Sequence, residues 1–127
     1  MLKSKELIFQ KLTGDQTLLN LVPAENIMYL RPQQEIVLPS VIFWEVSGVK
    51  DRIRNFEDEV FQIDIYAEDN IDEIAERVDE ILDGKRLKGN AGETIVVWLE
   101  RILKGEDFES DIYHKYLQYR VITNLNI

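Results

Sequence analysis

The chain has 127 residues, of which 45% are hydrophobic and 31% are charged, and its net charge is −9. These values are ordinary for a globular protein, so we expect a single domain over residues 1–127 with its own core. The acidic excess argues against a nucleic-acid reader and against binding to anionic membranes, because both partners are themselves negatively charged. No apolar run approaches the roughly 18 residues that a membrane-spanning helix needs.

The composition also limits the chemistry that one chain can perform. There is no cysteine, and His114 is the single histidine. This excludes disulfides, thiolate nucleophiles, cysteine-based metal sites and histidine-based triads or clusters within one chain. Acidic clusters occur at residues 57–59, 68–69 and 106–111, but none has the spacing of a calcium-binding loop. We therefore expect no catalytic residue, no metal site and no cofactor, and we do not expect an enzyme.

The first third of the chain predicts two helices and a short strand. Residues 3–13 have helical spacing, and Asp15 is a typical N-cap for a second short helix that ends before Pro23. Residues 26–30 are a candidate short strand. Pro39 precedes a stretch rich in β-branched and aromatic residues, which predicts a longer strand from residue 40.

The clearest pattern lies in the centre of the chain. Residues 60–67 alternate between apolar and polar, which predicts a strand, and residues 70–83 repeat at helical spacing. Asn70 and Glu73 are placed to form a capping box at the start of this helix, and Gly84 follows its end. The apolar stripe of the helix consists of Ile71, Ile74, Ala75, Val78, Ile81 and Leu82.

Two further strands are predicted at residues 94–103 and 111–123. Residues 85–93 read as a basic loop, while residues 49–59 and 104–111 read as charged connections. The predicted fold is α+β, with a mainly antiparallel four-stranded sheet on which the N-terminal helices and one amphipathic helix pack.

Strand alternation assigns residues to the two faces of this sheet. Phe61, Ile63 and Ile65 should meet the amphipathic helix, and the same parity places Trp44 and Val46 beside them. The second face then carries aromatic residues among polar ones: Phe43, Tyr66, Trp98, His114 and Tyr116. Such a face needs a cover, which the N-terminal helices or a partner subunit could provide.

Charge is segregated along the chain. Residues 57–83 contain twelve acidic residues and one basic residue, whereas residues 84–104 contain five basic and two acidic residues. One hypothesis is that the acidic helix of one subunit pairs with the basic segment of the next, and the alternative is that the acidic face is simply solvated. Phe56 and Phe108 are added as possible anchors because they lie in charged connections. The interface candidates are Phe43, Phe56, Glu76, Glu80, Lys85, Arg86, Lys88, Trp98, Arg101, Phe108 and Tyr116.

The order of motifs resembles a known family. The motifs are the helix–turn–helix LTGDQTLLNLV, the short strand in NIMYLRP, the proline-led strand LPSVIFWEVSG and the strand–helix unit FQIDIYAEDNIDEIAERVDEIL. In this order they resemble the tail completion, or tail terminator, proteins of long-tailed bacteriophages and prophages, which include the tail-to-head joining proteins. The resemblance runs along most of the chain and is one of pattern.

The resemblance implies a structural role with no reaction and no cofactor. Family members form a ring, commonly a hexamer, that ends polymerisation of the tail tube and faces the head–tail connector. It implies the tail tube protein and the connector protein as partners, and DNA that passes through the channel without specific binding. The expected location is the virion, at the interface of head and tail, after assembly in the host cytoplasm.

Two other classes remain open from the residues themselves. One is a small acidic α+β module that binds a ligand or regulates a partner as a dimer, and the other is a small enzyme that uses carboxylates. Particle size separates a ring from a dimer.

Overall fold

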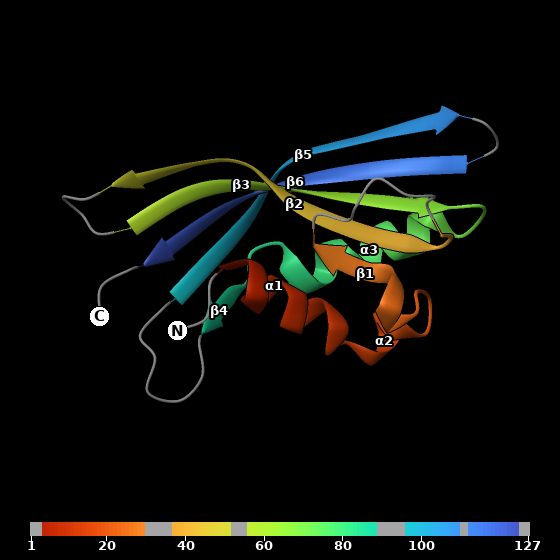
Figure 1. Cartoon of the computed structure of the whole chain (residues 1–127), viewed down its shortest axis with the longest axis horizontal. Coiled ribbons are helices and arrows are strands. Elements are labelled where there is room, and N and C mark those ends of the chain that lie inside the picture. The colour runs from red at the N-terminus through yellow and green to blue at the C-terminus, as the bar shows by residue number, and fades with distance from the viewer. Residues whose placement is uncertain (1–3, 30–36, 52–55, 89–95, 110–111, 125–127) are drawn as a thin grey trace.

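The structure, a computed structural model, describes residues 4–29, 37–51, 56–88, 96–109 and 112–124 (Figure 1). The elements in chain order are α1 (Ser4–Thr13), α2 (Gln16–Leu19), the 3₁₀ turn η1 (Ala24–Asn26), β1 (Ile27–Tyr29), β2 (Ser40–Asp51), β3 (Phe56–Ala67), α3 (Ile71–Leu82), β4 (Arg86–Lys88), β5 (Val96–Glu109) and β6 (Ile112–Asn124). Among the helices in these ranges, none is long and apolar enough to cross a membrane.

The strands form one six-stranded sheet in the order β1-β2-β3-β6-β5-β4. β1 runs parallel to β2, and all other neighbours are antiparallel. The prediction of a four-stranded sheet is therefore wrong, although the broad α+β class holds. The two added members of the sheet are β1 and β4 at its edges. β1 lies within the candidate short strand at residues 26–30, which the four-stranded prediction leaves out of the sheet, and β4 lies inside the segment predicted as a basic loop. β4 has three residues, which is too short for a periodic signal in the sequence.

Two hairpins are longer than the sequence indicates. The charged connections predicted at residues 49–59 and 104–111 are mostly strand, because β2 continues to Asp51, β3 begins at Phe56, and β5 continues to Glu109. Their charged side chains suppressed the strand signal. Pairing with a neighbouring strand satisfies the backbone whatever the side chains are, so a solvated strand can be rich in charge.

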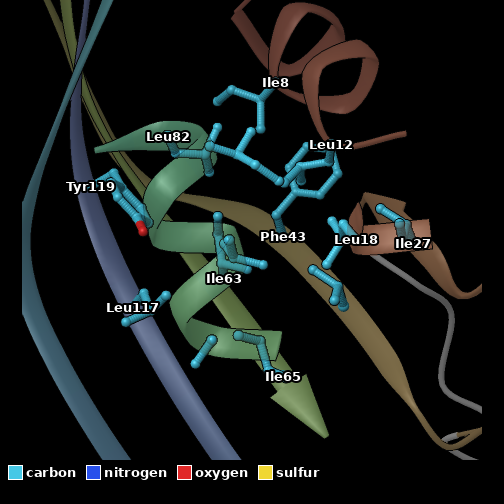
Figure 2. Close-up of a cluster of buried hydrophobic side chains, with 14 of the residues drawn as sticks. Ile8, Leu12, Leu18, Ile27, Phe43, Ile63, Ile65, Leu82, Leu117 and Tyr119 are labelled. Carbon is cyan, nitrogen blue, oxygen red and sulfur yellow. The ribbon is translucent and has the colours of Figure 1, made fainter. Parts of the chain in front are cut away.

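The three α-helices that the structure describes pack on one face of the sheet, where they bury a single core (Figure 2). Figure 2 shows α1 residues Ile8 and Leu12 above Phe43, with Ile63 and Tyr119 on the neighbouring strands. Each of these five side chains is at most 1% exposed. The prediction that Ile63 and its strand neighbours meet the stripe of α3 is confirmed. The N-terminal helices, however, share this face and do not cover the opposite one.

The face assignment for β2 is wrong. Phe43 lies opposite Ile63 and is fully buried in the core, whereas Trp44 lies opposite Gln62 and faces the other side. The register then shifts between Glu45 and Ser47, so Val46 is an inserted residue and is 42% exposed. An inserted residue of this kind, a β-bulge, breaks the alternation on which the assignment depended.

The helix ends have different caps from one another. Asp15 caps α2 as predicted, since its carboxylate accepts the N–H of Leu18 at 2.8 Å. Arg77 of α3 donates to the same carboxylate at 2.6 and 2.9 Å, which lowers the pKa of Asp15 and ties α2 to α3. Asn70 precedes α3 as predicted, but it has a φ of 45° and no side-chain cap bond, so the capping box with Glu73 is wrong.

The start of α1 is held to β3 by a buried carboxyl group. Glu59 is 6% exposed, and its Oε1 accepts the hydroxyl of Ser4 at 2.8 Å. Burial and the nearby carboxyl of Glu45 together raise the pKa of Glu59 to about 7, against the opposing effect of the hydrogen bond from Ser4. Glu59 therefore holds a proton in the folded protein at pH values where a solvated glutamate is ionised.

We expect Ile63→Ala and Ile74→Ala each to lower the free energy of unfolding by about 2–5 kcal/mol, because both side chains are at most 1% exposed and their removal leaves a cavity. Urea titration measures the loss. Glu73→Ala, at an exposed position on the same helix, is the control and should change stability little. Unchanged midpoints for both isoleucine variants would refute the described core.

We expect Glu59→Gln to change the pH dependence of stability. The folded-state pKa of about 7 lies above the ordinary value of 4.5, so the stability that the proton contributes is present below pH 4.5 and is lost as the pH rises through about 7. Relative to the unaltered protein, the variant should therefore gain about 2–3 kcal/mol between pH 5 and pH 8. Glu73→Gln controls for the loss of one charge, and an identical pH profile in the Glu59 variant would contradict the expectation.

Candidate interaction surface

The face of the sheet opposite the helices, here called the open face, has no cover among the described elements (Figure 1). Strand alternation and register place on it β3 residues Val60, Gln62, Asp64 and Tyr66 and β6 residues His114, Tyr116, Gln118, Arg120 and Ile122. Most of these side chains are partly buried by one another. The open face is therefore a packed layer of side chains, and its outer surface is available to a partner.

Asp64 is the centre of a hydrogen-bond network on the open face. Its Oδ1 is 2.8 Å from Nε2 of His114 and accepts Nε2–H of Gln62 at 2.9 Å, while its Oδ2 accepts the indole N–H of Trp44 at 2.7 Å. Gln118 donates in turn to Gln62 at 2.8 Å. Burial alone would raise the pKa of Asp64, but these hydrogen bonds outweigh burial and lower it. The carboxylate is thus fixed by three residues of its own chain, which gives it a structural role.

Aromatic rings shield this network from one side. Tyr66 and His114 stack at a centroid distance of 4.4 Å, and Tyr116 lies 5.7 Å from His114. Tyr116 is opposite Gly105 of β5, and a Cβ at that glycine would come within 2.2 Å of the tyrosine ring. Glycine at position 105 therefore allows the ring to lie across the strand.

The other end of the open face is more apolar. Trp98 and Val49 are 45% and 70% exposed, and Ile122 lies between them in the same cross-strand row. Arg86 stacks its guanidinium on Trp98 at 4.9 Å. Arg120 donates to both oxygens of Asp58 at 2.6 to 3.2 Å, which lowers the pKa of Asp58.

The acidic side of α3 is engaged largely within the chain. Asp79 accepts the hydroxyl of Tyr119 at 2.8 Å and the guanidinium of Arg101 at 2.9 Å. Lys115 lies 2.5 Å from Asp72. A groove between α3 and the β5–β6 hairpin is lined by these ion pairs and by Glu76, which has no partner among the residues that the structure describes.

The sequence candidates fall into four groups, of which three present no unpaired side chain that the structure describes. Phe43 is buried in the core, so it presents no surface in the folded subunit. Arg101 and Glu80 are exposed but form ion pairs within the chain, with Asp79 and Arg77 respectively. The side chains of Lys88 and Phe108 lie outside the part of the chain that the structure describes.

The remaining candidates lie at the surface. Trp98, Tyr116 and the half-buried Phe56 belong to the open face, where Arg86 joins them by stacking on Trp98. Lys85 and Glu76 are both exposed. Lys85 immediately precedes β4, whereas Glu76 lies on α3, so the two do not form one cluster. The structure therefore brings Phe56, Trp98 and Arg86 to one end of the open face, places Tyr116 at the other end, and separates the remaining charged candidates.

Two features of the surface are missing from the sequence candidates. The first is the network around Asp64, whose partners come from β2, β3 and β6 and have no common spacing. The second is the pair Ile102 and Leu103 on β5, which are 50% and 46% exposed. These two adjacent apolar residues break the strand alternation, and the register shift between Arg101 and Leu103 shows that the break is a β-bulge.

Comparisons with known proteins agree with this geometry. Residues 6–124 match the family described as tail completion protein gp17. A solved structure described as the virion of a native gene transfer agent particle has the same fold, with a TM-score of 0.74 at 18% identity over 94% of this chain and 93% of that one. A second solved structure has a TM-score of 0.59 at 12% identity over 93% of this chain and 95% of that one. No curated protein sequence matches the chain.

The family match covers every helix and strand of the described fold except the first two residues of α1. It confirms the resemblance drawn from the order of the motifs. The chain belongs to the tail completion protein gp17 family, whose members are structural components of phage tails.

Proposed function

We propose that the chain forms a ring at the head-proximal end of a phage tail tube, where it ends tube polymerisation and joins the tail to the head. The observation that carries this proposal is the family match, because it includes the sheet, its helices and both long hairpins. The role is structural and non-enzymatic. The proposed ring is a hexamer, and its partners are the tail tube protein on one side and the head–tail connector on the other.

The shape of the subunit supports a contact that repeats around a ring. A closed ring needs two different surfaces on each subunit that fit one another, and such a contact is called heterologous. Figure 1 shows that the β2–β3 and β5–β6 hairpins point to opposite ends of an elongated molecule. The two ends of the subunit therefore differ in sequence and in shape, as a repeating head-to-tail contact requires.

Charge supports a ring through which DNA passes without being held. Asp72, Glu73, Glu76 and Glu80 are all exposed on α3, and the chain carries a net charge of −9. Phosphates are repelled by such a surface. Pairing between the acidic helix and the basic segment of a neighbour stays a prediction, and the ion pairs of Arg101 and Lys115 within the chain reduce the charge left for it.

The function is tested by assembling tails with and without the chain. Without it, we expect tail tubes of variable and excessive length that fail to join heads, and addition of the purified chain should restore a uniform length. Electron microscopy of negatively stained tails measures tube length and locates the added chain. Uniform tubes in its absence, or binding at the end distant from the head, would contradict the proposed role, and a stable dimer on tails would favour the regulatory alternative.

We expect no appreciable binding to duplex DNA at about 150 mM salt, because the acidic excess opposes phosphate contacts. A fluorescence titration with labelled duplex measures this, and a micromolar dissociation constant would contradict it. The combined variant Glu73→Lys, Glu76→Lys and Glu80→Lys is the matched comparison. It should gain binding that weakens with added salt if the acidic face of α3 is what repels the duplex.

A further inference from the structure

β5 has a long free edge. β4 pairs only with Val96, Val97 and Trp98, and the chain after α3 adds backbone bonds to Leu99. The N–H of Arg101 is accepted by the side chain of Asp83. Beyond this point, none of the described strands lies along the outer side of β5 at residues 102–109, and such a stretch of backbone without a neighbouring strand is here called a free edge.

β2 has a matching free edge at the other side of the sheet. β1 pairs only with Val41, Ile42 and Phe43. The hydroxyl of Tyr29 takes part in a hydrogen bond with the backbone of Glu45. Within the described ranges, residues 46–51 have no strand beside them on their outer side.

The two free edges are oriented to pair with each other in neighbouring copies. β2, β3, β6 and β5 are successively antiparallel, so β2 and β5 run in opposite directions. Figure 1 shows the free part of β2 at one end of the molecule and the free part of β5 at the other end. A copy placed end to end with the same orientation would therefore bring its β2 edge antiparallel to the β5 edge of the first copy.

Exposed apolar residues lie on both free edges. Val46 and Val49 on β2 are 42% and 70% exposed, and Ile102 and Leu103 on β5 are 50% and 46% exposed. The register places Val49 in a row with Asp58, and Leu103 in a row with Gln118, so both face the same side of the sheet as the open face. Edge strands normally avoid such exposure because unpaired backbone groups beside apolar side chains invite pairing with another chain.

We propose that copies of this chain join by pairing the β5 edge, residues 102–109, with the β2 edge, residues 46–51, of the next copy. The contact continues the antiparallel sheet from one subunit into the next and places Val49 of one copy near Leu103 of the other. It rests on the proposed function, because it supplies the heterologous contact that the ring needs. The occupant of each edge is a second copy of this chain.

The test uses cysteine cross-linking, for which the absence of native cysteine gives a clean background. The double variant Val49→Cys with Leu103→Cys is oxidised during ring formation in solution and, separately, after addition to tail tubes. Within one subunit the two positions lie on strands that β3 and β6 separate, so they are at least about 14 Å apart and cannot form a disulfide. We expect a ladder of covalent oligomers that ends at the ring size.

Three matched samples identify the contact. Each single variant alone should stay monomeric on a denaturing gel, and an equal mixture of the two should give covalent dimers and nothing larger. Val49→Cys with Glu25→Cys, which puts the second cysteine on an exposed turn away from both free edges, should give no ladder. The experiment is then repeated with a short bis-maleimide, which links cysteines that a shift in register would leave too far apart for a disulfide.

The outcomes separate this inference from the proposed function. If rings form but neither oxidation nor the bis-maleimide gives cross-links, the edge pairing is wrong and the proposed ring still stands. Covalent dimers from Val49→Cys alone show a two-fold contact and also overturn it. A chain that forms no ring in solution and none on tails overturns the ring and the edge pairing together.

Discussion

The packing of every helix on one face of the sheet is the constraint on which the rest of the structure depends. The apolar stripe of α3 and the N-terminal helices pack on the same strands. Phe43, Ile63 and Tyr119 are therefore buried between the sheet and the helices, in one core. This burial supplies the main driving force for folding. It also uses every described helix on that face, so the opposite face has to satisfy its own polar groups. Among the residues that the structure describes, the sheet edges have no neighbouring strand beyond the short strands β1 and β4.

The side chains of the open face satisfy one another's hydrogen bonds without a second layer. Asp64 receives hydrogen bonds from three residues on three strands, so those strands are cross-linked above the sheet as well as within it. Tyr116 lies over Gly105 and covers backbone that a helix would otherwise cover. A surface that is already ordered loses less conformational entropy when a partner binds, which suits an assembly protein.

The sequence predicts those elements whose pattern is independent of their neighbours. α3 and β3 are predictable because one face of each is buried over the full length, which produces periods of 3.6 and 2. The faces of β2 cannot be predicted in this way. Phe43 and Trp44 are adjacent aromatic residues on opposite faces, so neither face is the more apolar one, and the inserted Val46 then shifts the alternation. The long hairpins escape prediction for another reason, since strand pairing outweighs the low β-propensity of charged residues there.

The charged surface residues show even more clearly what cannot be predicted from the sequence. The sequence reveals that opposite charges are segregated, but not whether they meet within one chain or between two, and Arg101 and Lys115 meet their acidic partners within one chain. The charge left at the surface is therefore mainly acidic, and at −9 each copy repels the next. Backbone pairing between sheet edges works against this repulsion without opposite charges, because N–H and C=O groups carry no net charge. In the proposed ring, repulsion then keeps free copies apart, and the end of the tail tube joins them by raising their local concentration.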